Sequence, residues 1–150
     1  MAITQAMCTS FKKELLTATH NFTNGQNSFK LALYAISGGG KSSSTATLGA
    51  ATTVFVTTGE VASSGTYATG GSALTNVTPT SSGTVGFCDF SDLSYTTATI
   101  TARGCLIYNS SQSNKAVCAL DFGGNKSSSS GTFTIQFPTA ASSTAIIRIS

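Results

Sequence analysis

Hydrophobic and polar residues alternate along most of this chain in a pattern that is typical of short β-strands. From Phe29 onward, apolar residues recur at every second position or form short runs bounded by glycine, serine and threonine. The segments that read as strands are 29–33, 54–56, 96–103, 104–109, 115–122, 133–137 and 146–149. The polar stretch 110–114 separates two of them and predicts a hairpin. With the weaker segments included, we expect about seven to nine strands.

The N-terminal segment has a different period. Ile3, Met7, Phe11 and Leu15 recur every four residues, which predicts a short helix that starts near residues 9–10 and ends before 17–21. Two roles are open for this helix. It packs on the core of its own domain, or it is an arm that docks on a neighbouring subunit.

These patterns predict a mostly β fold, an antiparallel β-sandwich or jelly roll with a short N-terminal helix. Helical crossovers between strands are missing, which argues against a parallel α/β sheet. Residues 1–150 are expected to form one domain, with 1–22 as a possible helical arm and 23–150 as the sandwich. The tracts 38–44, 63–72 and 127–131 are interpreted as surface loops.

Composition indicates how the surface is made. Only 9% of residues are charged, whereas 23 serines and 25 threonines supply polarity without charge. A hydroxyl is cheaper to desolvate than a charged group, so this surface suits repeated protein contacts. The net charge of +3 is spread along the chain, which argues against a nucleic-acid partner. No apolar run reaches the length of a membrane span, and the first residues lack the pattern of a secretory signal.

The four cysteines are Cys8, Cys88, Cys105 and Cys118, and they form no C-x-x-C pair. Because no secretory signal is visible, we expect buried, reduced thiols made in a cytoplasm. A disulfide between Cys105 and Cys118 is the alternative, since their two segments are predicted to pair.

Two segments imitate catalytic motifs. Gly38 to Ser42 follow a predicted strand as in a phosphate-binding loop, but Ala35 stands where the first glycine belongs and a poor helix sequence follows. His20 is the sole histidine, and no G-x-S-x-G motif accompanies it. We therefore expect His20 to be a helix cap or a surface residue.

Two aspartates and one tyrosine are further candidates for a functional role. Asp89 and Asp92 are close in sequence, and Asp89 or Ser91 is expected to cap a helical turn before the strand at Tyr95. A glycosidase pair or a Ca²⁺ site is the alternative. Tyr67 is expected to fold back on the sheet, with an exposed interface anchor as the alternative. The sequence assigns no catalytic, cofactor or metal-binding residue.

Long stretches of the chain resemble a family of small virion structural proteins of tailed bacteriophages. The resemblance rests on the opening MAITQAMCTSFKKELLTATHNF, on VASSGTYATGGSALTNV, and on TARGCLIYNSSQSNKAVCALDFGG with FTIQFP and AIIRIS after it. It implies a virion protein that is assembled in many copies in the bacterial cytoplasm. Such proteins are capsid decoration (cement) proteins or components of the neck and tail.

The sequence thus leads to three functional expectations. The first is a decoration protein without enzymatic activity or cofactor, a homo-oligomer expected to be a trimer, that bridges capsomers of the major capsid protein. The second is a neck or tail component or host-binding module. The third is a glycan hydrolase that relies on Asp89, Asp92 or Asp121.

Overall fold

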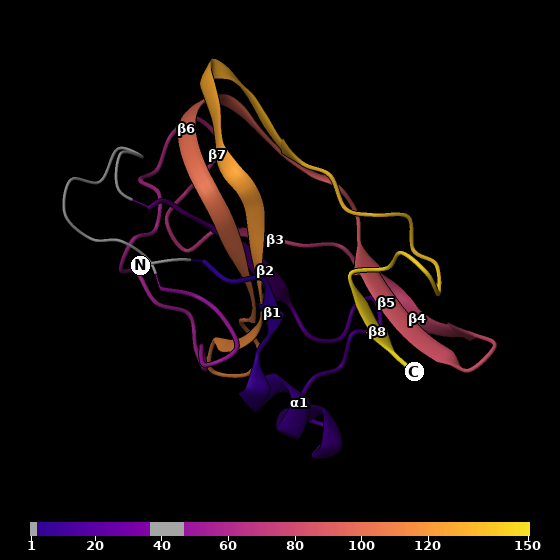
Figure 1. The fold of residues 1–150 in the computed structure, drawn as a ribbon. Coiled ribbons are helices and arrows are strands. Elements are labelled where there is room, and N and C mark those ends of the chain that lie inside the picture. Colours follow the sequence, from indigo (N-terminus) through magenta and orange to yellow (C-terminus); the bar gives the residue numbers. More distant parts are fainter. Residues whose placement is uncertain (1–2, 37–46) are drawn as a thin grey trace.

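The computed structural model describes residues 3–36 and 47–150, and within them the chain is mostly β. Its elements are β1 (Ala6–Met7), α1 (Thr9–Leu16), β2 (Phe29–Tyr34), β3 (Ser72–Ala73), β4 (Asn76–Ser82), β5 (Val85–Phe90), β6 (Leu93–Asn109), β7 (Lys115–Ile135) and β8 (Ile147–Ile149). They form two antiparallel sheets, with the orders β1-β7-β6-β2-β3 and β4-β5-β8 (Figure 1). The predicted mostly β, sandwich-like fold with a short N-terminal helix is confirmed.

The five-stranded sheet is built around β2. This strand has the sequence FKLALY, and all its residues except Lys30 are buried, as expected for a central strand covered on both faces. It pairs with the inner half of β6, from Phe29 opposite Asn109 to Tyr34 opposite Gly104. Its other edge pairs with the short strand β3.

An aromatic chain joins the two sheets. The rings of Phe22 and Phe29 stack with centroids 4.2 Å apart, and Phe29 lies 5.8 Å from Phe90 of β5. Phe90 in turn lies 5.6 Å from Phe137, which follows β7. Both sheets therefore share one hydrophobic core, with aromatic burial as a main source of its stability.

The N-terminal segment packs on this core. Phe11 of α1 is fully buried, and β1 pairs with β7 through Ala6 opposite Ala119 and Met7 opposite Cys118. The helix begins and ends close to the predicted residues. Ile3 and Met7, however, lie before it in extended backbone, because the bridge of Ile3 to Leu48 and the pairing of Met7 with Cys118 of β7 prevail over their helical spacing.

β6 and β7 form one long hairpin around the turn at 110–114, as predicted. Figure 1 shows this pair rising from the five-stranded sheet, bending at its top and descending toward β5. The register shifts between Ala98 and Ile100 and again between Ala102 and Gly104, and such irregularities bend a strand pair. The sequence pattern predicted two separate strands in place of β6 and two in place of β7, whereas each of these strands continues through the bend.

Two of the predicted elements are wrong. Residues 54–56 form no strand; within the described chain they contribute a single bridge, Val54 to Lys115. The serine tract 127–131 is not a loop but part of β7, because Ser127, Ser128 and Gly131 pair with residues of β6. Ladder hydrogen bonds thus override the weak strand propensity of serine and glycine.

Candidate functional site

The outer half of the β6–β7 hairpin, where residues 93–102 pair with residues 126–135, forms a long two-stranded surface away from the turn at 110–114. One side contributes Tyr95, Ala98, Ile100 and Phe133 to the core, and these residues are at most 6% exposed. The side chains that alternate with them are mainly threonine and serine, and most of these are exposed. This part of the hairpin therefore presents a polar and nearly uncharged outer surface.

Hydroxyl groups connect the two strands across this surface. Ser94 and Thr134 lie 2.9 Å apart through their side-chain oxygens, and so do Thr101 and Ser127. The Ser128 hydroxyl donates to the carbonyl of Ala98 at 2.8 Å. Such cross-strand pairs fix the rotamers of side chains that would otherwise be mobile, so a partner meets a pre-ordered surface.

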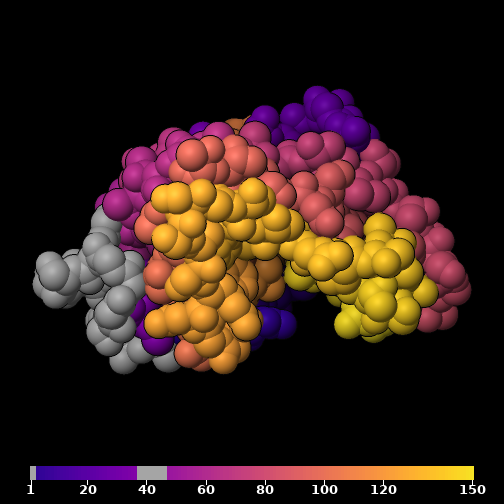
Figure 2. Space-filling model, turned by 90° about the horizontal axis from the view of Figure 1, so that it is seen from above, coloured from indigo at the N-terminus to yellow at the C-terminus, as the bar shows by residue number. Residues whose placement is uncertain are grey.

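A hollow of about 420 Å³ lies on the concave side of the bend in β7. It is lined by Phe122, Lys126 and Ser127 before the bend and by residues 132–136 after it. Figure 2 shows the β7 residues, in orange, exposed along the face turned to the viewer. The hollow thus combines a partly apolar floor with the open edge of a strand.

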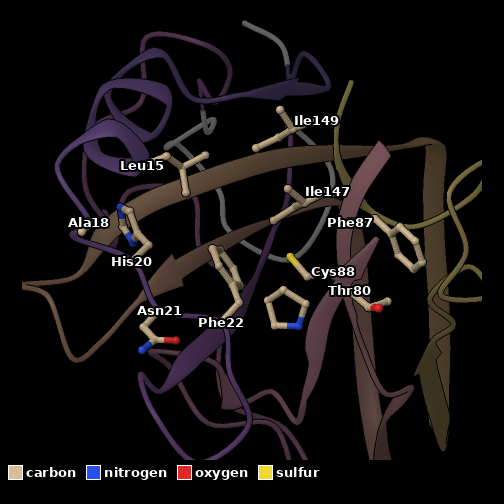
Figure 3. Close-up of a pocket in the computed structure, with 12 residues that line it drawn as sticks. Leu15, Ala18, His20, Asn21, Phe22, Thr80, Phe87, Cys88, Ile147 and Ile149 are labelled. Atoms are coloured by element: carbon tan, nitrogen blue, oxygen red, sulfur yellow. The ribbon is translucent and has the colours of Figure 1, made fainter. Parts of the chain in front are cut away.

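A second hollow, of about 410 Å³, lies between the segment after α1 and the three-stranded sheet. Figure 3 shows Leu15, Phe22 and Ile147 around it, with His20 and Cys88 in its wall. Most of its lining is apolar, and Ile149 at its rim is 58% exposed. The size is within the range of ligand pockets, but few polar groups converge on it to orient a ligand.

His20 is buried rather than at the surface, and it does not cap the helix. Its Nε2 lies 2.8 Å from a carboxylate oxygen of Glu14, and its Nδ1 lies 3.0 Å from the amide nitrogen of Asn109. The other Glu14 oxygen accepts from Lys115 Nζ at 2.8 Å. Burial alone would raise the pKa of Glu14, but the hydrogen bonds from Lys115 and His20 outweigh burial and hold the pKa below its usual value.

This network pairs a histidine with a carboxylate, as in many catalytic sites, but contains no nucleophile beside the imidazole. Asn109 occupies the second ring nitrogen, and the hydrogen-bond partners of the imidazole include no serine or cysteine in the described residues. A nucleophile would have to be within hydrogen-bond reach of the imidazole. The arrangement therefore connects α1 to the base of the hairpin rather than activating a nucleophile.

Glu60 is a buried carboxylate that the sequence analysis missed. It is 1% exposed, and one oxygen accepts from the hydroxyl of Tyr67 at 2.9 Å and from the backbone N–H of Gly70 at 2.5 Å. Tyr67 is also buried, and its hydroxyl accepts from the N–H of Leu33. Tyr67 is thus folded onto the sheet as expected, and the exposed-anchor alternative is wrong. Burial raises the pKa of the Tyr67 hydroxyl well above its usual range.

Each of the three aspartates of the hydrolase hypothesis is hydrogen bonded. Asp89 lies inside β5 and accepts from the backbone N–H of Phe90 and Ile146. The predicted helical turn before Tyr95, capped by Asp89 or Ser91, is wrong, because β6 begins at Leu93 and residues 91–92 form no turn. Burial raises the pKa of Asp89 despite these hydrogen bonds. Asp92 accepts from the N–H of Phe137 at 2.8 Å. Both carboxylates bind backbone, the usual arrangement of structural aspartates.

Asp121 lies on the hairpin, where Arg103 of the opposite strand donates to it through Nε at 2.7 Å and Nη2 at 3.2 Å. This pairing lowers the pKa of Asp121. The arginine fork matches a carboxylate in two places, so it fixes both side chains. Within residues 3–36 and 47–150, no cluster of three or more histidine, cysteine or acidic side chains has the geometry of a metal site.

All four cysteines are buried and free, as the sequence predicted; the alternative disulfide between Cys105 and Cys118 is not formed. In the register of β6 and β7, Cys105 faces Leu120 and Cys118 faces Ile107, so the two are not opposite each other. Burial raises the pKa of the Cys8 thiol to about 11 and of the Cys88 thiol to about 12. Such thiols are poor nucleophiles.

The remaining sequence motif, Gly38 to Ser42, lies outside the described residues. Among the described residues, no helix has the length and apolar content to cross a bilayer. No protein-family model, no curated protein and no solved structure matches the chain.

Proposed function

We propose that this protein is a structural subunit of a tailed-phage virion, most specifically a capsid decoration protein that works by binding other copies and the capsid surface. The proposal assigns it no catalytic step and no cofactor. Its partners are further copies of itself, in a closed homo-oligomer, and the major capsid protein. Its place of action is the virion, after assembly in the bacterial cytoplasm.

One observation carries this proposal. The chain extends its longest strand pair well beyond β2, and it covers the outer half with exposed hydroxyls rather than charges. Exposed hydroxyls are solvated when the protein is free, and they lose little on burial against a partner. A surface of this kind suits a subunit that must be soluble after synthesis and then bind many identical neighbours.

The buried polar groups are consistent with this function. Glu60, His20 and Asn109 are hydrogen bonded to side chains or backbone of other segments of the described chain. Such contacts hold the half of the hairpin next to the turn at 110–114 rigidly against the rest of the domain. A rigid subunit loses less conformational entropy on assembly. The resemblance to virion proteins in the sequence points in the same direction.

Gold-labelled antibodies against this chain test the location directly. On purified particles of the phage that encodes it, we expect dense labelling over the whole head. Removal of the protein should make heads release DNA at a lower temperature, because decoration adds binding free energy across capsomer boundaries. Label confined to the neck or tail would contradict the decoration function and support the tail alternative.

A further inference from the structure

The outer edge of β7 is open over most of its length. β1 covers it only at Cys118 and Ala119, and in the described part of the chain no strand pairs with the edge from Phe122 to Ile135. An open strand edge presents unpaired N–H and C=O groups, which are a template for another strand. Proteins usually shorten or charge such edges, yet Lys126 is the only charged residue from 122 to 136.

The direction of the backbone groups identifies the usable part of this edge. The N–H of Phe137 points to the β6 side, where it donates to Asp92. Because backbone groups alternate along an extended strand, the N–H groups of Thr132 and Thr134 face away from β6. Their side chains are exposed, while Phe133 between them is buried. Residues 132–136 thus offer a regular set of donors and acceptors beside the 420 Å³ hollow.

A second copy of the same chain fits this edge best. Two identical edges can pair antiparallel about a two-fold axis, which joins the two five-stranded sheets into one continuous sheet. Charge does not oppose this pairing. With the axis near Phe133, each Lys126 lies seven positions from the axis along its own chain, outside the paired segment 132–136. The small hydroxyl side chains at 132 and 134 leave room for close approach.

We propose that residues 132–136, at and just after the end of β7, pair antiparallel with the same residues of a second copy, and that this two-fold pair is the unit from which the protein assembles. The proposal rests on the proposed function as an assembly subunit and names its first partner. The elementary unit is then a dimer rather than the trimer expected from the sequence.

Proline at position 134 tests this pairing in purified protein. Thr134→Pro removes one outward N–H and leaves the ladder with β6 intact, because the nitrogen does not face β6. Sedimentation equilibrium should show a dimer for the wild type and at least a tenfold larger dissociation constant for Thr134→Pro. Thr134→Val changes the side chain but keeps the N–H, and it should dimerise like the wild type. A monomeric wild type, or a Thr134→Pro variant that dimerises equally well, would overturn the proposal.

A cross-linking experiment covers the case in which Thr134→Pro fails to fold. The four native thiols are at most 5% exposed, so cysteines introduced on β7 are the only accessible ones. With Thr132→Cys and Thr134→Cys combined, a short bis-maleimide should link two chains whether the axis lies at residue 132, 133 or 134. Thr58→Cys, at an exposed turn far along the chain, is the matched control and should stay uncross-linked. Equal cross-linking of both proteins would contradict the pairing. Because these experiments use no particles, their outcome is independent of the labelling result.

Discussion

The Nδ1 atom of His20 lies 3.0 Å from the amide nitrogen of Asn109, which is 89 residues further along the chain. An amide nitrogen can only donate, so Nδ1 accepts and Nε2 carries the proton that is donated to Glu14. The same amide nitrogen also donates to the side-chain oxygen of Asn27 at 3.0 Å. Asn109 at the end of β6 therefore binds the connection between α1 and β2 at two points, His20 and Asn27.

Replacing Asn109 with alanine should lower the stability of the fold. The side chain is fully buried, and its loss leaves Nδ1 of His20 without a donor and removes one of the two donors to the side-chain oxygen of Asn27, which also accepts from the N–H of Asn21. We expect a cost of about 2–3 kcal/mol in the free energy of unfolding, measured by urea denaturation. Asn125→Ala, at an exposed position of β7, is the control and should change stability by less than about 0.5 kcal/mol. Equal effects of both substitutions would show that the network contributes nothing.

Glu14 makes stability depend on pH in the acid range. Its pKa is below the usual value of 4.5 in the folded protein, because the hydrogen bonds from Lys115 and His20 outweigh the opposing effect of burial. The stabilisation is therefore full above the unfolded pKa and is lost as pH falls through the folded pKa.

The variant Glu14→Gln isolates this contribution, because the wild-type protein also contains Asp89, whose raised pKa acts in the opposite direction. We expect Glu14→Gln to be about 1 kcal/mol less stable than the wild type near neutral pH. The difference should shrink as pH falls through the lowered pKa of Glu14 and vanish once the Glu14 carboxylate is itself protonated. A difference that stays constant between these two conditions would argue against the ion pair.

Several elements could be predicted from the sequence because a local signal specified them. The period of four near Phe11 predicted α1, the apolar run at Phe29 predicted β2, and the polar stretch 110–114 predicted the hairpin turn. Residues 127–131 had the opposite local signal, since serine and glycine are typical of loops. Only the pairing with β6, which no local pattern reveals, makes them strand.

The polar clusters were beyond sequence reasoning for a similar reason. Glu14 and His20 are six residues apart, but Asn109 is 89 residues beyond His20, and only the folded chain brings all three together. Glu60 follows a glycine in a polar stretch, and nothing in its neighbourhood indicates burial. The only local signal was in the loop that binds the Glu60 carboxylate, where Tyr67 and the adjacent glycines Gly70 and Gly71 interrupt a polar stretch.

Substitutions of two adjacent glycines, Gly70 and Gly71, test how closely the loop that contains them approaches β2. Gly70 and Gly71 both have positive φ angles, 95° and 72°, which alanine adopts only with strain. At Gly71 an added Cβ would also overlap the backbone carbonyl of Leu31, whereas nothing lies within 4 Å of one at Gly70. We expect thermal unfolding to show a loss of about 1 kcal/mol for Gly70→Ala and of about 3 kcal/mol for Gly71→Ala. Equal losses would mean that the loop is not held against β2.

The thiols should be inert until the protein unfolds. Because burial raises the pKa of Cys8 and Cys88 to about 11 and about 12, a disulfide reagent should titrate no thiol in the native protein at neutral pH. After denaturation without reductant, it should titrate all four. Fewer than four would reveal a disulfide and would contradict the buried, reduced core. Fast reaction of one thiol in the native state would show that its segment opens.

The copy number of this chain per particle tests the central claim most directly. Absolute quantification by mass spectrometry of purified virions, with an isotope-labelled peptide of this chain as the standard, gives that number. A decoration protein should be present in several hundred copies, in a fixed ratio to the major capsid protein. About a dozen copies or fewer would place it in the neck or tail. Its absence from purified particles would contradict the structural function altogether.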